Sequence, residues 1–314
     1  MSTLQDLRSS NHAAPQTGGV RFAPSPTGRF HVGNLRTAWI SWKFAKALNI
    51  PWVVRYEDID RPRVLAGAQE FQASDMREFG MKADVTLIQS EFYPRHLELF
   101  ERARTEGAVY ACDCSRKDVL NALAGMASAP NDGRVPAYSG HCRHRGLARE
   151  GGPTINPGIM SLAWRMKMPR EDGQDDVIIA RTSVGGEHFV PAYHWACAID
   201  DFDGAYDLLV RSSDLAHALV IQRGIQEWLM KSHGLTRDFP RVFHTALITQ
   251  NDGHRLEKRT AGVTLEELKL NGIDPAKLIS VFEKSFDSGL LSAAFDGLRT
   301  LEEAPASMTL ATLG

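Results

Sequence analysis

The sequence of 314 residues is poor in cysteine and has no long apolar run. Its four cysteines are too few and too unevenly placed for a disulfide framework, which argues against a small secreted scaffold. No stretch of about eighteen consecutive apolar residues occurs, and residues 1–19 contain no apolar segment of signal-peptide length. We therefore expect a cytoplasmic protein that does not contact a membrane.

A strong excess of charge of either sign is also missing. The formal net charge is −2 at pH 7, so any contact with a polyanion has to come from local patches. With 43% hydrophobic residues the chain can bury a sizeable core, and its length suits two domains or one domain with a large insertion. No interface stripe is evident, and a monomer is expected.

The first third of the sequence alternates between strand and helix patterns. Strands are predicted over 20–23, 51–57 and 85–88, and helices over 33–48, 66–79 and 94–106. Such alternation is typical of a parallel α/β sheet with right-handed crossovers. Residues 112–186 are instead rich in glycine, proline and charge, which predicts an inserted subdomain with long loops.

The pattern of core elements resumes after the insertion. The segments "AYHWACAIDD" (192–201), "YDLLVR" (206–211) and "VFHTALIT" (242–249) are predicted as strands, and 213–233 as a helix. The last fifty or so residues are predicted to form two or three short helices. The fold class expected from residue patterns is therefore α/β.

The segment "RFAPSPTGRFHVGN", residues 21–34, links the first predicted strand to the first predicted helix. A strand that leads through His31 and Gly33 into a helix places backbone N–H groups and a positive helix end at the carboxyl edge of a parallel sheet. His31 can also donate a hydrogen bond to phosphate. The arrangement favours an anion site, although an ordinary strand-to-helix turn is an alternative that this segment alone leaves open.

The same fourteen residues, followed by "LRTA", resemble the first signature of class I aminoacyl-tRNA synthetases in the form of the glutamyl branch. Further segments of the branch follow in order: "VRYEDIDRPR", "YACDC", "AYSGHC", "AYHWACAIDD", "LVRSSDL" and "DGHRLEKRT". The resemblance covers about residues 20–262. It implies a Rossmann-type parallel sheet with an inserted zinc-containing subdomain and a short helical C-terminal part.

The resemblance also implies a domain layout. The expected parts are a flexible tail 1–19, a first catalytic half 20–110, a zinc-binding insertion 111–190, a second catalytic half 191–262 and a helical remnant 263–314. Only 56 residues follow Lys258, which leaves no room for the anticodon-binding region of a full glutamyl-tRNA synthetase. This truncated layout resembles the glutamyl-Q tRNA(Asp) synthetase family, which implies ATP-dependent activation of L-glutamate without tRNA and transfer to the queuosine base of tRNA(Asp).

Site residues are carried over by resemblance onto matching positions. The expected glutamate contacts are Arg21, Ala23, Ser25, Glu57, Tyr193 and Arg211. The expected contacts of ATP, bound with Mg²⁺, are His31, Gly33, Asn34 and Lys258, of which His31 and Lys258 are expected to be catalytic. Arginines suit the two carboxylates and Glu57 suits the ammonium group. For Glu57 a surface ion pair with Arg55 or Arg61 is the alternative, and Asp200 and Asp201 are interpreted as structural.

Three of the cysteines predict a metal site. The pattern Cys112-x-Cys114, followed by Tyr138-x3-Cys142, offers three thiolates and a phenol, a set that suits tetrahedral zinc. On chemistry alone His141 or His144 could replace Tyr138, which is favoured by resemblance only. Cys197 lies in an apolar segment and is predicted to be core. The neighbouring "HCRHRGLAR" is a local basic patch, which could hold an RNA backbone or be a solvated loop.

Two departures from the family pattern leave other functions open. The lysine signature has Arg255 and Glu257 around Leu256 before Lys258, which places a carboxylate where a small hydroxyl usually faces the triphosphate. Ser212 also stands where a glycine is usual. The alternatives are 3′ charging of tRNA, as by a glutamyl-tRNA synthetase, and a non-catalytic paralogue.

Overall fold

The computed structural model describes residues 13–115, 117–119, 138–147, 154–155, 159–169, 175–184, 188–248, 264–287 and 300–302. Lys258 and the rest of the lysine signature lie outside these residues. The chain divides into two compact units. We call the unit with Ala13–Phe92, Asp200–Leu219 and the chain from Leu235 the sheet unit, and the one with Tyr93–Ile199 and Val220–Gly234 the insert unit. The domain boundaries expected from the sequence stay a prediction.

The sheet unit is built on a six-stranded sheet in the order β10-β9-β8-β1-β2-β3, and all its strand pairs are parallel. The strands are β1 (Val20–Phe22), β2 (Trp52–Tyr56), β3 (Val85–Ile88), β8 (Leu208–Ser212), β9 (Arg241–Thr245) and β10 (Thr300–Glu302). The parallel α/β sheet expected from the sequence is confirmed. Strand β10, in the part expected to be helical, was not predicted.

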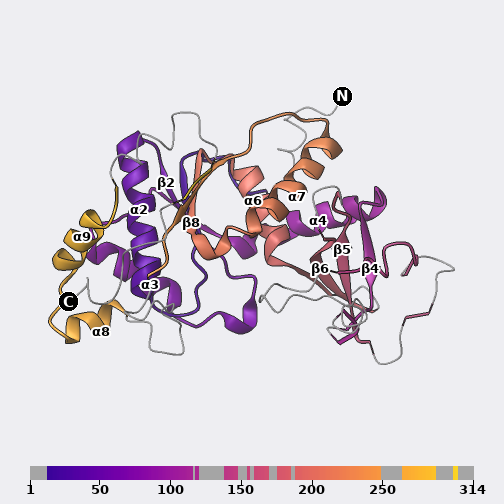
Figure 1. Ribbon diagram of the computed structural model, residues 1–314, viewed down its shortest axis with the longest axis horizontal. Helices are drawn as coiled ribbons and strands as arrows, with labels where there is room; N and C mark the ends of the chain where they lie inside the picture. Colours follow the sequence, from indigo (N-terminus) through magenta and orange to yellow (C-terminus); the bar gives the residue numbers. More distant parts are fainter. Residues whose placement is uncertain are drawn as a thin grey trace, which may run out of the picture. The chain divides into compact units, whose positions relative to one another are not determined.

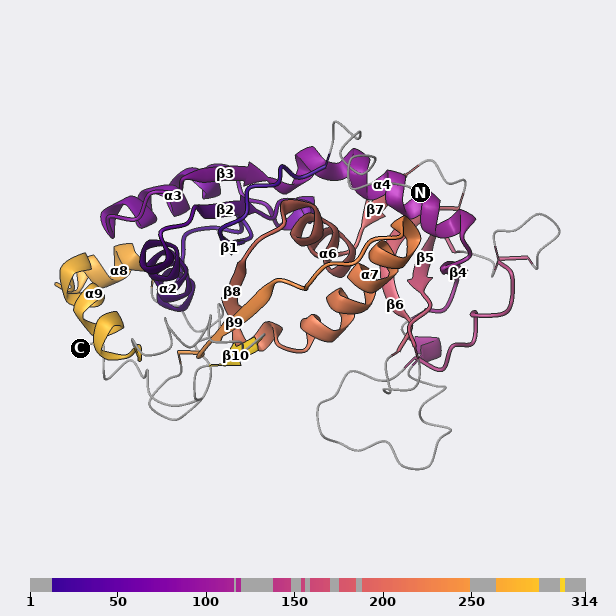
Figure 2. The same cartoon turned by 90° about the horizontal axis from the view of Figure 1, so that it is seen from above.

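One face of this sheet is covered by helices, as Figures 1 and 2 show for indigo α2 and yellow α8 and α9. These helices are α2 (Val32–Leu48), α8 (Leu265–Leu270) and α9 (Pro275–Lys284). Every second strand residue, such as Val54 and Phe243, joins their apolar side chains in one buried cluster. Within it Phe44 lies 4.9 Å from Phe243 between ring centroids. The apolar strand residues therefore point toward these helices, and the alternate strand residues point to the opposite face of the sheet.

The opposite face changes character along the strands. Near the strand beginnings it carries the buried apolar residues Val53, Leu209 and Val242. Two residues further along the strands, this face carries Arg55, Arg211 and His244, which are also buried. We call these three side chains the charged face, together with Arg21 of β1, which lies on the same face in the row of Val53 and Leu209. It lies toward the carboxyl ends of the strands, where parallel α/β sheets bind their ligands.

The insert unit contains a four-stranded antiparallel sheet in the order β4-β5-β6-β7 (Figure 2). Its strands are β4 (Val109–Cys112), β5 (Ser161–Met166), β6 (Val177–Ser183) and β7 (Phe189–Pro191). Phe100 of α4 (Tyr93–Thr105) packs between Trp164 and Phe189, with ring centroids 5.2 and 4.9 Å away. The predicted insertion is therefore a packed sheet with its own aromatic core.

The segment predicted as a strand over 192–201 is a helix, so that prediction was wrong. It forms α6 (Tyr193–Gly204), in which Trp195, Cys197 and Ile199 are all buried. Because residues 195–204 are all buried, the apolar residues of this segment show no period that would separate a helix from a buried strand. Cys197 is a core residue as expected.

The helices predicted over 66–79 and 213–233 are confirmed as α3 (Ala68–Glu78) and as η3 (Ser213–Leu215) followed by α7 (Ala218–His233). Two short helical turns, η1 (Arg61–Arg63) and η2 (Gln89–Phe92), were not predicted. Among the residues that the structure describes, none of the helices has both the length and the hydropathy needed to cross a bilayer.

Candidate functional site

The turn after β1 is held by hydrogen bonds to its backbone. The backbone N–H of Glu57 donates to the carbonyl of Pro24 over 2.9 Å, which joins the turn to the end of β2. The Gln72 side chain donates to the carbonyls of Ser25 and Gly28 over 3.1 and 2.8 Å. Ala23 is half-buried and Ser25 is exposed. The predicted substrate turn and Glu57 are thus brought together with a defined backbone.

His31 begins α2 as its N-cap. Its Nδ1 accepts a hydrogen bond of 3.3 Å from the Asn34 backbone N–H. Because Nδ1 is the acceptor, the ring proton of a neutral His31 is assigned to Nε2, and this tautomer can donate to a phosphate. A Cβ on Gly33 would lie 3.2 Å from both Cε1 and Nδ1 of His31. Gly33 therefore gives the imidazole room to fold over the helix start.

If the start of α2 binds ATP, as the resemblance implies, Gly33→Ala should raise the KM for ATP about tenfold, because the added methyl group displaces the His31 ring and weakens one hydrogen bond worth roughly 1–1.5 kcal/mol. Steady-state pyrophosphate exchange measures this. His31→Asn, which keeps a good N-cap, gives the reference. If Gly33 acts through His31, adding Gly33→Ala to His31→Asn should cause little further loss. Equal losses in both backgrounds would contradict this role.

The charged face is built around one carboxylate, Asp201 of α6. Arg21 donates to it through Nε over 3.0 Å and through Nη2 over 2.5 Å. Arg55 donates to it through Nη1 over 2.8 Å and to Glu57 through Nη2 over 3.0 Å. Asp200 lies 3.9 Å from Arg55 Nε and accepts a hydrogen bond of 2.7 Å from Gln89. The structure thus pairs two buried arginines with three carboxylates.

Burial and charge act against each other in this cluster. Burial by itself would lower the pKa of Arg55, but Asp201 and Asp200 raise that pKa well above its usual value. Burial would likewise raise the pKa of Asp201, but Arg21 and Arg55 hold it below its usual range. These groups are therefore charged at neutral pH, and each depends on its partners to remain so. The interpretation of Asp201 as structural agrees with these contacts.

The other predicted glutamate contacts differ in burial and in the unit to which they belong. Arg211 is 5% exposed, and its Nε donates to His244 Nε2 over 3.2 Å, which orients the guanidinium without cancelling its charge. Glu57 is 9% exposed, so its pair with Arg55 is buried and not the surface pair considered as an alternative. Tyr193 belongs to the insert unit, at the start of α6.

Sequence reasoning considered Arg55 only as a surface partner of Glu57 and did not name Gln89. A usable signal for Arg55 was its spacing of two from Glu57, which places both side chains on one face of β2. For Gln89 and its partner Asp200, which are 111 positions apart, no local signal exists.

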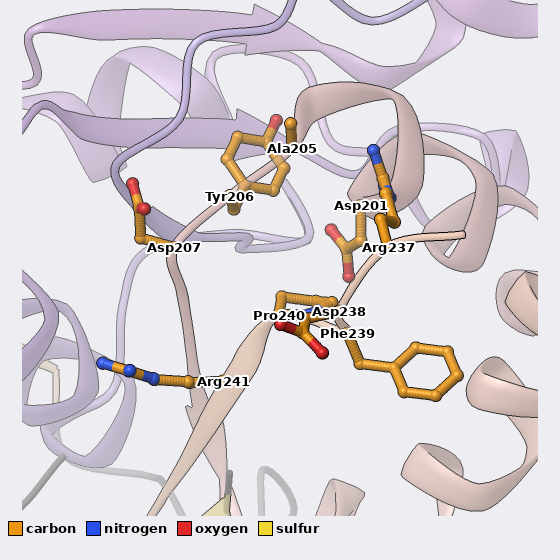
Figure 3. Close-up of a pocket in the computed structure, with 9 residues that line it drawn as sticks. All are labelled: Asp201, Ala205, Tyr206, Asp207, Arg237, Asp238, Phe239, Pro240 and Arg241. Atoms are coloured by element: carbon orange, nitrogen blue, oxygen red, sulfur yellow. The ribbon is translucent and has the colours of Figure 1, made fainter. Parts of the chain in front are cut away.

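A pocket of about 350 Å³ lies at the other end of the sheet, at the beginnings of β8 and β9 (Figure 3). Asp207, just before β8, and Arg241, the first residue of β9, line it together with Asp201, the central carboxylate of the charged face (Figure 3). Arg211 and His244 stand three residues beyond the first residues of β8 and β9. The pocket therefore lies at the beginnings of the strands and borders the charged face at Asp201, whereas Arg211 of the predicted substrate site lies further along β8.

The predicted metal ligands come together in the insert unit. The sulfur atoms of Cys112, Cys114 and Cys142 all lie within 4.8 Å of one another, with Cys114 and Cys142 3.5 Å apart. The Tyr138 hydroxyl lies 3.4 Å from Cys112 Sγ and 3.9 Å from Cys114 Sγ. Tetrahedral zinc with bonds of about 2.3 Å to sulfur and about 2.0–2.2 Å to oxygen needs separations of about 3.5–3.8 Å. The three thiols could hold a metal ion, and the phenol lies at a matching distance.

The electrostatics of the cluster suit a cation. A hydrogen bond from Cys142, together with one from Tyr138, lowers the pKa of Cys112 to about 4. Burial raises the pKa of Cys114, and the hydrogen bond to Cys112 raises that of Cys142. A thiolate attracts a divalent ion, and binding of the ion then displaces the protons of the two neighbouring thiols. Among the described residues, no histidine joins the three cysteines as a possible ligand.

Comparison with known proteins gives the family. Residues 19–288 match the model of the catalytic domain of class I tRNA synthetases for E and Q. Glutamyl-Q tRNA(Asp) synthetases of Synechococcus and Nocardia farcinica are each 33% identical, over 88% and 87% of this chain and 86% of theirs. The chain belongs to the glutamyl-Q tRNA(Asp) synthetase family. This family consists of ligases similar to class I aminoacyl-tRNA synthetases, as the signature segments implied.

The chain is also similar to part of longer enzymes. A glutamate–tRNA ligase of Legionella pneumophila is 34% identical over 83% of this chain, but the match covers only 55% of that protein. Among solved structures, a glutamate–tRNA synthetase of Elizabethkingia anophelis matches with a TM-score of 0.71 at 21% identity, over 95% of this chain and 69% of the other. That likeness confirms the class I synthetase fold.

Proposed function

We propose that the protein activates L-glutamate with ATP in the absence of tRNA and then transfers the glutamyl group to the queuosine base of tRNA(Asp). The carrying observation is the charged face, where Arg211 lies near the carboxyl end of β8 beside the pair that Arg55 forms with Glu57, and Arg21 lies one row earlier on the same face. Membership in the glutamyl-Q tRNA(Asp) synthetase family supplies the reaction class.

The charges of this face suit an amino acid with two carboxylates. Arg21 commits Nε and Nη2 to Asp201, so Nη1 is the nitrogen left for a substrate carboxylate. Arg211 presents a guanidinium positioned by His244 for the second carboxylate. Glu57, held by Arg55, offers a carboxylate to the substrate ammonium group. In this proposal Ala23 and Ser25 add contacts from the turn, and Tyr193 is a further contact of the bound glutamate.

The first step of the proposed reaction needs positioning more than proton transfer. An oxygen of the glutamate α-carboxylate attacks the α-phosphorus of ATP, the bond from that phosphorus to the bridging oxygen breaks, and pyrophosphate leaves. His31, Gly33 and Asn34 at the start of α2 bind phosphate oxygens, and Lys258 neutralises charge together with Mg²⁺. In the second step the acyl group passes to queuosine, and AMP leaves.

We further propose that the metal is zinc, with Tyr138 as the fourth ligand beside Cys112, Cys114 and Cys142. When bound, zinc would hold the insert unit together and need not take part in the chemistry, since four protein ligands leave no open position. The 3.4 and 3.9 Å separations of the phenol from two of the sulfurs support this choice.

The activity is tested by pyrophosphate exchange with glutamate and ATP but no tRNA. We expect exchange by the wild type, and a rise of about 10- to 100-fold in the KM for glutamate in Arg211→Gln, because a charge-assisted hydrogen bond is worth about 1.5–3 kcal/mol. The KM for ATP should change little. Arg241→Gln, at the other end of the sheet, is the matched control and should leave both constants unchanged.

Two results would contradict the proposal. Absence of exchange that is not restored by Glu257→Ser would remove the activation step. Labelling of tRNA(Glu) at its 3′ end, in place of tRNA(Asp) that carries queuosine, would overturn the transfer step and favour charging of the glutamate–tRNA ligase type.

A further inference from the structure

A second pocket, of about 410 Å³, lies wholly within the insert unit. It is lined by residues of α4 and β4, the loop that follows Cys142, and the end of β5. Its charged or titratable lining residues are Glu101, Arg104, Tyr110, Arg143, His144 and Lys167. We call it the cation pocket. Apart from Tyr193, every described residue proposed to bind glutamate or ATP belongs to the sheet unit, so the cation pocket is not part of that site.

The cation pocket carries an excess of positive charge. Arg104, Arg143 and Lys167 face a single lining carboxylate, that of Glu101. Asp176, which pairs with Arg143 over 2.8 Å but does not line the pocket, reduces the excess to one charge. The sequence as a whole has a net charge of −2, so this excess is local. Positive excess in a concave surface attracts anions because low-dielectric walls focus the field.

Each cation is held in place by a contact that uses only some of its donors. Arg143 commits Nη1 to Asp176, and Lys167 donates to the carbonyl of Gly107 over 2.7 Å. Arg104 commits Nη1 to Glu101, and its guanidinium carbon lies 4.9 Å from the centre of the Trp164 ring. Because guanidinium and ammonium groups have further N–H donors, several point charges are positioned while hydrogen-bonding capacity remains.

The ligand chemistry follows from this donor set. Two guanidinium groups and one lysine ammonium group line the same pocket, and their N–H groups can donate hydrogen bonds to the oxygens of a phosphate ester. The side chains of Arg104 and Arg143 are 40% and 20% exposed, so the donors lie at a rim past which a polymer can continue. The volume also exceeds what a single phosphate group fills. A sugar–phosphate backbone fits these features better than a small enclosed anion.

We propose that the cation pocket binds a phosphodiester of the RNA substrate. This inference rests on the proposed function, in that it takes tRNA(Asp) as the substrate. It assigns the basic patch after Cys142 an RNA contact through Arg143 and His144, whereas Arg145 pairs with Asp113 over 2.8 Å. The pocket contributes to binding of RNA and not to activation of glutamate.

The test measures the Kd for queuosine-bearing tRNA(Asp) by fluorescence anisotropy over a range of salt concentrations. For Arg104→Gln and Lys167→Gln we expect the Kd to rise about three- to tenfold each, and the salt slope to decrease by about 1 for each phosphate that is no longer neutralised. Glu101→Gln, which removes the opposing charge, should lower the Kd. The control is Lys231→Gln, an exposed lysine of the same unit outside the pocket.

Pyrophosphate exchange without tRNA separates this inference from the proposed function. Exchange should stay at the wild-type rate in all four variants, which also shows that they are folded. Competition by inorganic phosphate, with the same sensitivity as tRNA to Lys167→Gln, would indicate a small-anion site and overturn the RNA assignment. Wild-type Kd and salt slope in the pocket variants, or an equal loss in Lys231→Gln, would overturn it as well. If the wild type itself fails to bind this tRNA, both the transfer step and this inference fall.

Discussion

Replacing Asp201 with asparagine is expected to lower the free energy of unfolding by about 3–5 kcal/mol, because breaking a buried ion pair leaves uncompensated charge. Asp201 is 1% exposed and accepts three hydrogen bonds, two from Arg21 and one from Arg55. In the variant an amide N–H₂ faces guanidinium donors, and both arginines lose the charge that offsets their burial.

Urea denaturation followed by tryptophan fluorescence and by circular dichroism measures this change, provided that both probes report the same transition. Asp238→Asn serves as the control, since Asp238 is exposed in the pocket of Figure 3 and its loss should change the free energy by less than about 0.5 kcal/mol. Equal stability of the two variants would show that Asp201 does not hold the charged face together.

The shifted pKa of the same carboxylate makes the free energy of unfolding depend on pH. The pKa of Asp201 is lower in the folded protein than in the unfolded chain, so the unfolded state takes up the proton first as pH falls. Its contribution is therefore present in full above the ordinary aspartate pKa of about 3.9 and is lost as pH falls through the lower folded value. In Asp201→Asn this part of the acid dependence should be missing.

Removal of the metal is expected to have the second large effect. Zinc binding in small structural sites contributes about 10–16 kcal/mol, so the loss of one of three thiolates should release the ion and destabilise the insert unit. Elemental analysis of protein purified without chelator should give about one zinc per chain, and the metal should be lost in Cys112→Ser and Cys142→Ser. Because the ligands must be deprotonated, affinity should fall with decreasing pH.

Cys197→Ser is the matched control for this experiment. Cys197 is also buried, but in α6 and outside the cluster, so its substitution should leave the metal in place. Tyr138→Phe tests the fourth ligand, and a lower metal affinity with folding retained is expected. Metal-free wild-type protein, or retention of zinc in Cys112→Ser, would remove the site.

Much of the sheet could be predicted from local sequence. The strands β1, β2 and β3 are short apolar segments bounded by turn residues, and the alternation with helices implies parallel pairing. α6 could not be predicted in this way, because a segment buried on all sides loses the hydrophobic period that distinguishes a helix from a strand. Strand β10, Thr300–Glu302, has one apolar residue between two polar ones, and its pairing with β9 is with a distant segment, so no local pattern indicates it.

The sequence by itself determined which residues belong to the candidate metal site and to the candidate substrate turn. The spacing of Cys112, Cys114 and Cys142 and the composition of the turn 21–34 are local features of the chain. Only the tertiary structure decided how the charges pair. It brings Asp201 onto Arg21, 180 positions earlier, and sets the Tyr138 hydroxyl 3.4 Å from Cys112. The physical reason is that an ion pair or a coordination sphere forms only between atoms a few ångströms apart. Strand register and packing set these distances, and they cannot be read from the number of residues between two positions.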